Sequence, residues 1–564
     1  MWENQLSLRE HFLPANQKAV WMSKLGFPKS YPSPGVIPLD HGLSSTLRLR
    51  PEGEAHATKY LPVLTSALLA VLVYAVTLHG TYIYDDVKIV HTDPRVLEPD
   101  RWYQLWTQPF FARSIDKLYR PLVSSSFALE NYLHGDRPWI FHLVNILLHA
   151  TVSASVALLA LRLAGVRAAW VAGLLFAVHP VHVEAVAGLV GRAESACALA
   201  IILGLWLFLR DGPVTLWRSV ALVGCFMAAL LSKEQGVLFP LLIVGAYPLK
   251  YSGRLSPEDR RRLTYLGIAL CWMLVAYLLL RERVASFSWD RNQLDWYVNP
   301  ILKSQGLDRL MMPVALLGRY TMLLIFPRHL SIDYGGTIIG WTTSLHDPYF
   351  VAGLVALTGW FMAVLFSWRR RNYPLLFCLF GLALTYGMVG NIVALIGTIF
   401  ADRLMYLPSI FFLLTVGIAL SKFRPTIIAP VVGVLVVVGG IGSFSYAMLW
   451  NDPIALFEYT LRIHPQSERA YGLLADTYRD SGDLGQVVEV AKRACAAVPD
   501  RWEPYALLID AQLAIQDYDA AMAAAEAGLA HVSAKDERLV FIQWEETIAR
   551  KKAEAAKQSS DPAR

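Results

Sequence analysis

Charge is scarce in this sequence. Of its 564 residues only 17% are Asp, Glu, Lys or Arg and 55% are hydrophobic, against about 25% and roughly 45–50% in ordinary globular proteins. A soluble multidomain protein is therefore excluded, and the mean hydropathy of +0.40 indicates a polytopic membrane protein with a soluble part attached. The net charge of +6 is too small and too dispersed to favour nucleic acid as a partner.

Several other signals are missing. Cysteine occurs five times, without the spacing of a disulfide framework or of a Cys-x-x-Cys zinc site. No G-x-G-x-x-G follows a strand-like run and no G-x-x-x-x-G-K-[ST] occurs, so a nucleotide-binding domain has no support. Residues 1–60 lack the pattern of a cleaved signal peptide, and we expect the first apolar segment to remain as a membrane anchor.

Apolar segments near the length of about 20 residues that a span requires recur along the chain. We place eleven of them at about 60–79, 141–163, 168–179, 194–210, 215–231, 235–249, 263–280, 348–368, 373–391, 404–421 and 426–447. The predicted fold class is an all-α polytopic membrane protein. An N-terminal arm (1–59) precedes a transmembrane domain (60–449), and a tail (450–564) follows.

The distribution of Lys and Arg sets the orientation. If the N-terminus is cytoplasmic, inner loops hold clusters such as Arg260–Arg262 and Arg369–Arg371. The short outer loops then hold only Arg192, Lys233 and Arg403. We therefore expect a cytoplasmic N-terminus, and the odd number of spans places the tail on the extracytoplasmic side.

Two outer loops are long, 80–140 and 281–347, and hold most of the polar residues outside the spans. The apolar segment Leu310–Pro327 could be a twelfth span, but a crossing there would move Arg369–Arg371 to the outside. We interpret this segment as re-entrant or as lying along the outer surface.

The tail carries an internal repeat. Residues of the same kind recur 34 positions apart, as in Tyr471/Tyr505, Asp483/Asp517 and Ala491/Ala525. A helix–turn–helix period of 34 residues is typical of TPR repeats. About two and a half repeats fit, and helix 536–554 is predicted to cap the array with a polar face. By itself such an array packs or docks partners without chemistry of its own.

Adjacent carboxylates follow the first span in YIYDD, 82–86. Their repulsion raises the pKa of one of them unless a cation or metal is near, and such a group can act as general base toward a hydroxyl. Asp85 and Asp86 are therefore candidate catalytic residues. The alternative is a solvated interfacial loop within an aromatic belt.

A second polar group lies in FAVHPVHVEAVAGLVGRAE, 176–194. Pro180 begins a helix, which places His179 at the cap and His182 in the first turn, with Glu184 near the positive end of the helix dipole. These are residue types of a metal site, but no third ligand has a clear spacing. A polar lining for a cavity at the outer mouth of the bundle is favoured.

Two charged pairs lie at other outer turns, Lys233-Glu234 and Asp402-Arg403. They either neutralise each other at the interface or hold an anionic headgroup. Arg120 is a further phosphate candidate, because a guanidinium fork matches phosphate oxygens. An enzyme outside the cytoplasm without a nucleotide site needs an activated donor delivered in the membrane, and a lipid-linked phosphosugar meets that need.

Seven stretches and the tail repeats together resemble the TMTC-like (transmembrane and TPR repeat-containing) O-mannosyltransferases, relatives of the protein O-mannosyltransferases within the GT-C glycosyltransferase superfamily. The stretches are YIYDD (82–86), LYRPL (118–122), FHLVNILLHA (141–150), FAVHPVHVEAVAGLVGRAE (176–194), LLSKEQG (230–236), IFPRHLSIDYG (325–335) and DRLMYLPS (402–409). The resemblance runs over about 80–535 and implies a GT-C bundle.

This resemblance implies transfer of a sugar, mannose in this family, from a polyprenyl- or dolichyl-phosphate donor to a hydroxyl of a protein or peptide, with inversion. Asp85 would be the base and Asp86 its support. Candidates for the donor phosphate are Arg120, Arg192, Lys233 and Arg403. The cavity and acceptor site would comprise His179, His182, Glu184, Glu194, Glu234 and Asp402.

No obligatory cofactor or metal is implied, and a divalent metal is left open. The expected location is the bacterial inner membrane with the tail in the periplasm, or the membrane of the endoplasmic reticulum with the tail in the lumen. Two alternatives stand beside this reading. One is an oligosaccharide ligase or polymerase that uses a lipid diphosphate donor, and the other is a non-catalytic scaffold whose TPR tail recruits partners.

Overall fold

The computed structural model describes residues 52–111, 118–251, 253, 255–285, 299–336, 338–340, 342–393, 395–532 and 535–560. The chain divides into two compact units, Met1–Ala55 and His56–Arg564, and the second is described below. The predicted N-terminal arm, 1–59, lies almost wholly outside the described residues.

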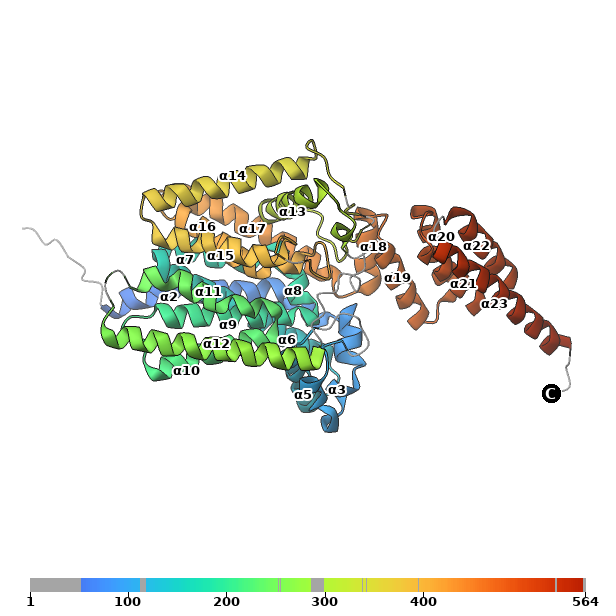
Figure 1. Cartoon of the computed structure of the whole chain (residues 1–564), viewed down its shortest axis with the longest axis horizontal. Helices are drawn as coiled ribbons and strands as arrows, with labels where there is room; N and C mark the ends of the chain where they lie inside the picture. Colours follow the sequence, from blue (N-terminus) through green and yellow to red (C-terminus); the bar gives the residue numbers. More distant parts are fainter. Residues whose placement is uncertain are drawn as a thin grey trace, which may run out of the picture. The chain divides into compact units, whose positions relative to one another are not determined.

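The second unit contains a bundle of helices that lie side by side (Figure 1). They are α2 (Glu52–Tyr74), α6 (Pro138–Ala164), α7 (Val166–Val178), α9 (Arg192–Leu209), α10 (Leu216–Ser232), α11 (Phe239–Lys250), α12 (Pro257–Ala285), α14 (Pro348–Arg369), α15 (Tyr373–Val389), α16 (Tyr406–Leu420) and α17 (Pro425–Leu449). Each predicted span overlaps one of these helices, and no strand occurs in the described ranges. The all-α fold of a polytopic membrane protein is thereby confirmed.

Length and composition qualify seven helices of the described chain as membrane spans. The count rises to eight if Val166–Val178 and Pro180–Ala187, which meet at a bend of 51°, form one span. Two shorter apolar helices, Leu216–Ser232 and Tyr373–Val389, accompany them. The number eleven therefore stays a prediction.

Local sequence explains where the bundle helices begin and end. The Asp347 carboxylate accepts a hydrogen bond from the Tyr349 amide at 2.7 Å, and Pro348 starts α14, as expected of an N-cap followed by proline. Thr215 caps α10 by accepting from the Arg218 amide, without a following proline. Between α6 and α7, Gly165 has φ +83°, a backbone conformation that side chains disfavour, so the chain reverses within one residue.

Helix α13 (Asp308–Ile325) packs closely against α14. A Cβ at Gly318 would lie 1.8 Å from the Tyr349 carbonyl oxygen, and one at Gly353 would lie 1.9 Å from the Val314 carbonyl oxygen. Only glycine permits this backbone contact. Among the described helices α13 is not one of the candidate spans, and its predicted re-entrant or surface course stays a prediction.

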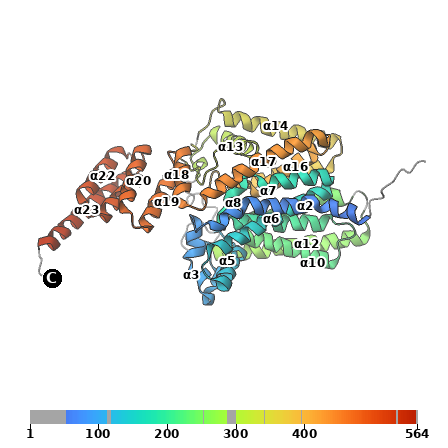
Figure 2. The same cartoon turned by 180° about the vertical axis from the view of Figure 1, so that it is seen from behind.

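Short helices gather at one end of the bundle. They are α3 (Pro94–Leu97), α4 (Gln104–Thr107), α5 (Pro121–His134) and α8 (Val183–Ala187). The tail continues from the same end, as both views show (Figures 1 and 2). The side chain of Asn451, just after α17, donates to the Val76 carbonyl at the end of the first span at 3.1 Å. The first long loop and the tail therefore share one face of the bundle.

The tail is a succession of helices, α18 (Pro453–Ile463), α19 (Glu468–Asp480), α20 (Leu484–Ala497), α21 (Glu503–Ala514), α22 (Tyr518–His531) and α23 (Lys535–Ser560). Asp483 and Asp517 cap α20 and α22 by accepting from the amides of Gln486 and Ala520. The residues before these caps, Gly482 and Gln516, both have positive φ. The turn thus repeats at the predicted 34-residue period, while the TPR assignment itself stays a prediction.

Candidate active site

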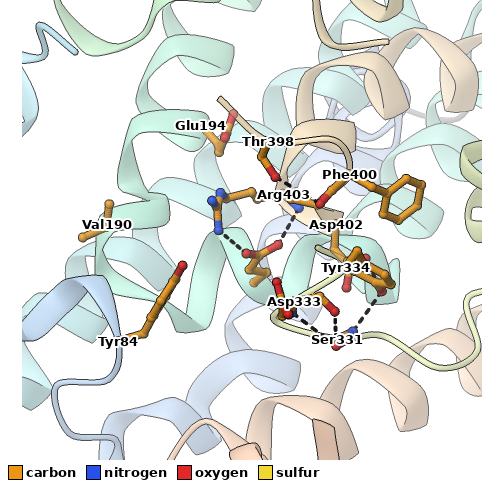
Figure 3. A network of polar contacts seen from close by, with 12 residues as sticks. Tyr84, Val190, Glu194, Ser331, Asp333, Tyr334, Thr398, Phe400, Asp402 and Arg403 are labelled. Carbon is orange, nitrogen blue, oxygen red and sulfur yellow. Dashed lines mark hydrogen bonds and ion pairs between the residues drawn. The ribbon is translucent and has the colours of Figure 1, made fainter. Parts of the chain in front are cut away.

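The polar segments singled out in the sequence converge at the end of the bundle where the tail begins. They come from the loop after α2, the residue before α5, the ends of α8 and α10, the loop after α13, and the short helix Asp402–Met405 before α16. Figure 3 shows Arg403 from that short helix between Glu194 of α9 and Tyr84 of the first loop. Residues hundreds of positions apart therefore line one region.

Asp86 is a buried support for the neighbouring loop. Its carboxylate oxygens accept from the backbone N–H groups of Leu189 and Val190 at 3.1 and 2.9 Å. Burial raises the pKa of Asp86 to about 7, although these two hydrogen bonds act in the opposite direction. Both carboxylate oxygens are therefore engaged by the protein, and the supporting role expected of Asp86 stays a prediction.

The side chain of Asp85 differs from that of Asp86 in its contacts. The side chain is partly exposed, and no hydrogen bond or ion pair joins its carboxylate to another residue in the described part of the chain. Burial raises the pKa of Asp85, and the positive charges of Arg403, Arg469, Lys88 and Arg120 counteract that rise. A carboxyl group with a raised pKa and no protein partner has the properties required of a general base.

The residue directly before Asp85 has a strained backbone. Tyr84 has φ +60°, which is uncommon for a residue with a side chain and costs free energy unless its surroundings fix it. Its hydroxyl accepts a hydrogen bond from the guanidinium of Arg469, on tail helix α19, at 2.9 Å. A tail residue thus takes part in the site.

Arg403 and Glu184 form an ion pair in which the arginine is partly exposed and the glutamate is buried. Glu184 accepts from the Arg403 amide at 2.8 Å and from its Nη1, while the Nε and Nη2 atoms of Arg403 donate to no acceptor in the described ranges. The Arg403 side chain is 30% exposed. Next to it, Asp402 accepts from the Tyr334 hydroxyl at 2.8 Å. Arg403 therefore combines a fixed position with free donors.

Two further acid–base pairs lie deeper. Arg120 holds Glu234 through two hydrogen bonds of 3.3 and 2.8 Å. Burial alone would raise the pKa of Glu234, but the Arg120 charge and hydrogen bonds lower it to about 2. Lys233 pairs with one oxygen of Glu194. The other Glu194 oxygen and both amide atoms of Gln235 are buried without a partner in the described structure.

Arg192 differs from the other predicted phosphate ligands. Its guanidinium donates to Asn145 at 2.8 Å, to the Phe141 carbonyl at 3.0 Å, to Ser126 at 2.8 Å and to both oxygens of Glu130. A guanidinium has five N–H donors, so none remains for a phosphate. The side chain ties α9 to α5 and α6.

The predicted histidines are embedded in the protein. Nδ1 of His179 accepts from the Val181 amide at 3.3 Å, so Nε2 carries the proton and donates to the Leu324 carbonyl at 2.9 Å. His182 contacts the Phe176 carbonyl and the Ser409 hydroxyl. Neither ring has a nitrogen free for a metal, and the described residues include no group of three or more metal-ligating side chains.

Sequence reasoning missed three contributors. Asp333 and Tyr334 lie within the recognised stretch IFPRHLSIDYG but were not singled out, although a buried acid followed by an aromatic hydroxyl is a usable signal. Arg469 carries no local signal, because it meets Tyr84 only across 385 residues of chain.

Two described cavities, of about 350 and 410 Å³, are lined by other residues, including Arg309 and Arg319.

Fold and site together define a polytopic α-helical membrane protein with a charged cluster at one end of its bundle. The chain is similar to protein O-mannosyl-transferases, which confirms the resemblance inferred from its motifs. It is 26% identical over 447 residues to one from Caenorhabditis elegans, covering 76% of this chain and 61% of that protein. It is 31% identical over 326 residues to the mouse protein O-mannosyl-transferase TMTC2, covering 52% of this chain and 38% of the relative.

A third relative, the human protein O-mannosyl-transferase TMTC4, is 26% identical over 475 residues, which cover 74% of this chain and 63% of the relative. This chain thus spans less than two thirds of the length of these relatives. No family model matches it.

Proposed function

We propose that this protein is a membrane glycosyltransferase that moves a sugar, mannose by analogy with the names of its relatives, from a lipid-phosphate donor to a hydroxyl of a protein acceptor. The observation that carries the proposal is the Asp85 carboxylate, which has no partner among the described residues and lies in the region of three acid–base pairs. The relatives, which are protein O-mannosyl-transferases, supply the reaction class.

In the proposed reaction, the Asp85 carboxylate takes the proton of the acceptor hydroxyl as its oxygen attacks the anomeric carbon. The new C–O bond forms as the bond to the lipid phosphate breaks, and the phosphate leaves with that electron pair as an anion. Attack from the opposite face inverts the anomeric centre. Asp85 is left protonated, and it releases the proton to water to complete the cycle.

The departing phosphate would be held by cations that still have donors. Arg403 is the best placed, because its Nε and Nη2 have no described acceptor. Arg120 and Lys233 are supported more weakly, since each is engaged with a glutamate and more deeply buried. Fixed donors at the position where charge develops stabilise the transition state. Arg192 has no donor left for such a role and is omitted.

The buried polar atoms without partners fit a sugar-binding wall. Buried polar groups are normally hydrogen-bonded, yet Glu194 Oε2 and the Gln235 amide lack partners in the described structure. Sugar hydroxyls donate and accept, and they match this mixture of acceptor and amide groups. His179, His182 and Asp402 would then shape the cavity from behind.

The test uses the full chain in lipid nanodiscs, a synthetic polyprenyl-phosphate mannose and a Ser/Thr-containing peptide. Loss of general-base catalysis typically costs about 10²–10⁴-fold in rate, and we expect Asp85→Asn to lower kcat within that range. Asp100→Asn, an exposed acid of the same loop, is the matched control and should keep wild-type activity. Undiminished transfer by Asp85→Asn would reject the base assignment.

Two rival outcomes are separable in the same system. Transfer only from a lipid diphosphate oligosaccharide would indicate a ligase or polymerase. Absence of transfer from either donor, with partner recruitment lost on deleting 450–564, would indicate a scaffold.

The proposed side of the membrane is extracytoplasmic: a cysteine introduced by Ser481→Cys, on an exposed tail turn, should react with an impermeant reagent from that side only.

A further inference from the structure

The start of tail helix α19 touches the site at two separate points. The Ser467 hydroxyl donates to Asp333 Oδ2 at 2.7 Å and accepts from the Ala470 amide, so it caps the helix while it binds the loop after α13. Both Ser467 and Asp333 are buried. Two residues further, Arg469 donates to the Tyr84 hydroxyl at 2.9 Å. Helix α19 is therefore fixed on both the second and the first outer loop.

Each of these loops leads directly to a residue of the proposed reaction. Asp333 precedes Tyr334, whose hydroxyl donates to Asp402 beside Arg403. Tyr84 precedes Asp85 and has the strained φ of +60°. Figure 3 shows Tyr84 on one side of Arg403 and Asp333 and Tyr334 on the other. Contacts made by α19 therefore act on both the proposed base and the cation that would hold the phosphate.

We infer that Arg469 is a positioning residue for this reaction: it holds the Tyr84–Asp85 turn so that the Asp85 carboxylate faces the site, and tail helix α19 is thereby part of the catalytic unit. This inference rests on the proposed function. Without an anchor on its side chain, the backbone of Tyr84 would relax out of its strained left-handed conformation. The hydrogen bond to the Tyr84 hydroxyl supplies that anchor. A charged donor at that hydroxyl anchors the side chain more firmly than a neutral one would.

Arg469 also contributes charge. The charged and titratable groups near Asp85 come from several elements: Tyr84, Asp86 and Lys88 from its own loop, Arg120 ahead of α5, Arg403 ahead of α16, and Arg469 from the tail. Loss of Arg469 removes one of the positive charges that counteract the raised pKa of Asp85. Because Asp85 must be deprotonated to act as a base, the acid limb of the profile of activity against pH should then move to higher pH.

The experiment measures kcat and KM against pH for the full chain in nanodiscs. We expect Arg469→Gln to lower kcat about tenfold or more, with a smaller effect on KM, and to move the acid limb upward by about one pH unit. Arg469→Lys should restore the position of that limb. Tyr84→Phe removes only the accepting oxygen and should lower kcat without moving the limb as far. The double variant should be no worse than the poorer single one.

Arg479→Gln is the matched control, because Arg479 lies on the same helix but pairs with Asp476 on the surface. An unchanged kcat and pH profile in Arg469→Gln would overturn the inference. So would a loss that Tyr84→Phe does not share. Asp85→Asn with full activity would instead reject the base assignment of Asp85, whatever Arg469 does.

A measurement that does not depend on sugar transfer separates the positioning role of Arg469 from the proposed transferase function. In Asp85→Cys, the rate of thiol alkylation against pH reports the local charge and access. Adding Arg469→Gln should move this profile to higher pH and slow an anionic reagent several-fold. Identical profiles would overturn the positioning role even if transfer is confirmed, whereas a shifted profile in a chain without transfer would uphold the arrangement and reject the transferase.

Discussion

Two Arg–Glu pairs with the same bidentate chemistry lie in contrasting regions. Arg192 and Glu130 join α9 to α5 at the end of the bundle, with 2% and 12% of their side chains exposed. Arg493 and Glu458 join α20 to α18 in the tail, with 40% and 34% exposed. Removing a charge from water is costly, so a buried pair must be matched closely, whereas a surface pair contributes little either way.

This difference shows how the two regions are organised. The end of the bundle concentrates buried charges that bind one another, and such groups are expensive at membrane depth and are usually functional. The tail is held by apolar contacts, such as those of the fully buried Ala491 and Ala525. Buried charge at the end of the bundle therefore marks the candidate site, while pairs such as Arg493 and Glu458 lie on the surface of the tail.

The largest effect is expected from Arg192→Gln. The change leaves Glu130 buried without its cation and removes the donors to Asn145 and to the Phe141 carbonyl. Breaking a buried pair by removing one partner costs about 3–5 kcal/mol. We expect strongly reduced thermal stability and low yield of folded protein in detergent. A stable Arg192→Gln protein with only a raised KM for the donor would contradict the structural role and restore Arg192 as a phosphate ligand.

The next effect concerns Asp86 and pH. Because the pKa of Asp86 is raised to about 7 in the folded chain and is about 3.9 when unfolded, folding favours its protonated form. The resulting stability is fully present below about pH 4 and is lost as pH rises through 7, a change of up to about 4 kcal/mol.

Asp86→Asn keeps the size and loses the charge. Its thermal stability, measured between pH 5 and pH 8.5, should fall less with rising pH than that of the wild type. Asp100→Asn, on the exposed surface, should leave the wild-type slope in place. An equal slope in the wild type and in Asp86→Asn would mean that Asp86 keeps an ordinary pKa.

Much of the fold and part of the site follow from sequence alone. Apolar runs such as 141–163 predicted α6 because burial in lipid requires about 20 apolar residues in a helix. The two adjacent acids were recognised as a unit, but their separate roles depend on the Leu189 and Val190 amides, which approach Asp86 from over 100 residues away. Arg192 and Arg403 likewise look alike in sequence, and only the number of acceptors around each distinguishes them.

The smallest effect is expected from Arg493→Gln, which is the same substitution as Arg192→Gln made in a solvent-exposed pair. Hydrogen bonds of 2.7 and 3.0 Å join Arg493 to Glu458, but water competes for both partners. Exposed pairs contribute about 0.2–1 kcal/mol and weaken with salt because counterions screen them. Arg493→Gln should therefore lower thermal stability only slightly, and 0.5 M salt, at which the Debye length is about 4 Å, should reduce the difference further. A loss as large as that of Arg192→Gln would show that exposure does not set the strength of these pairs, and the contrast between bundle and tail would fail.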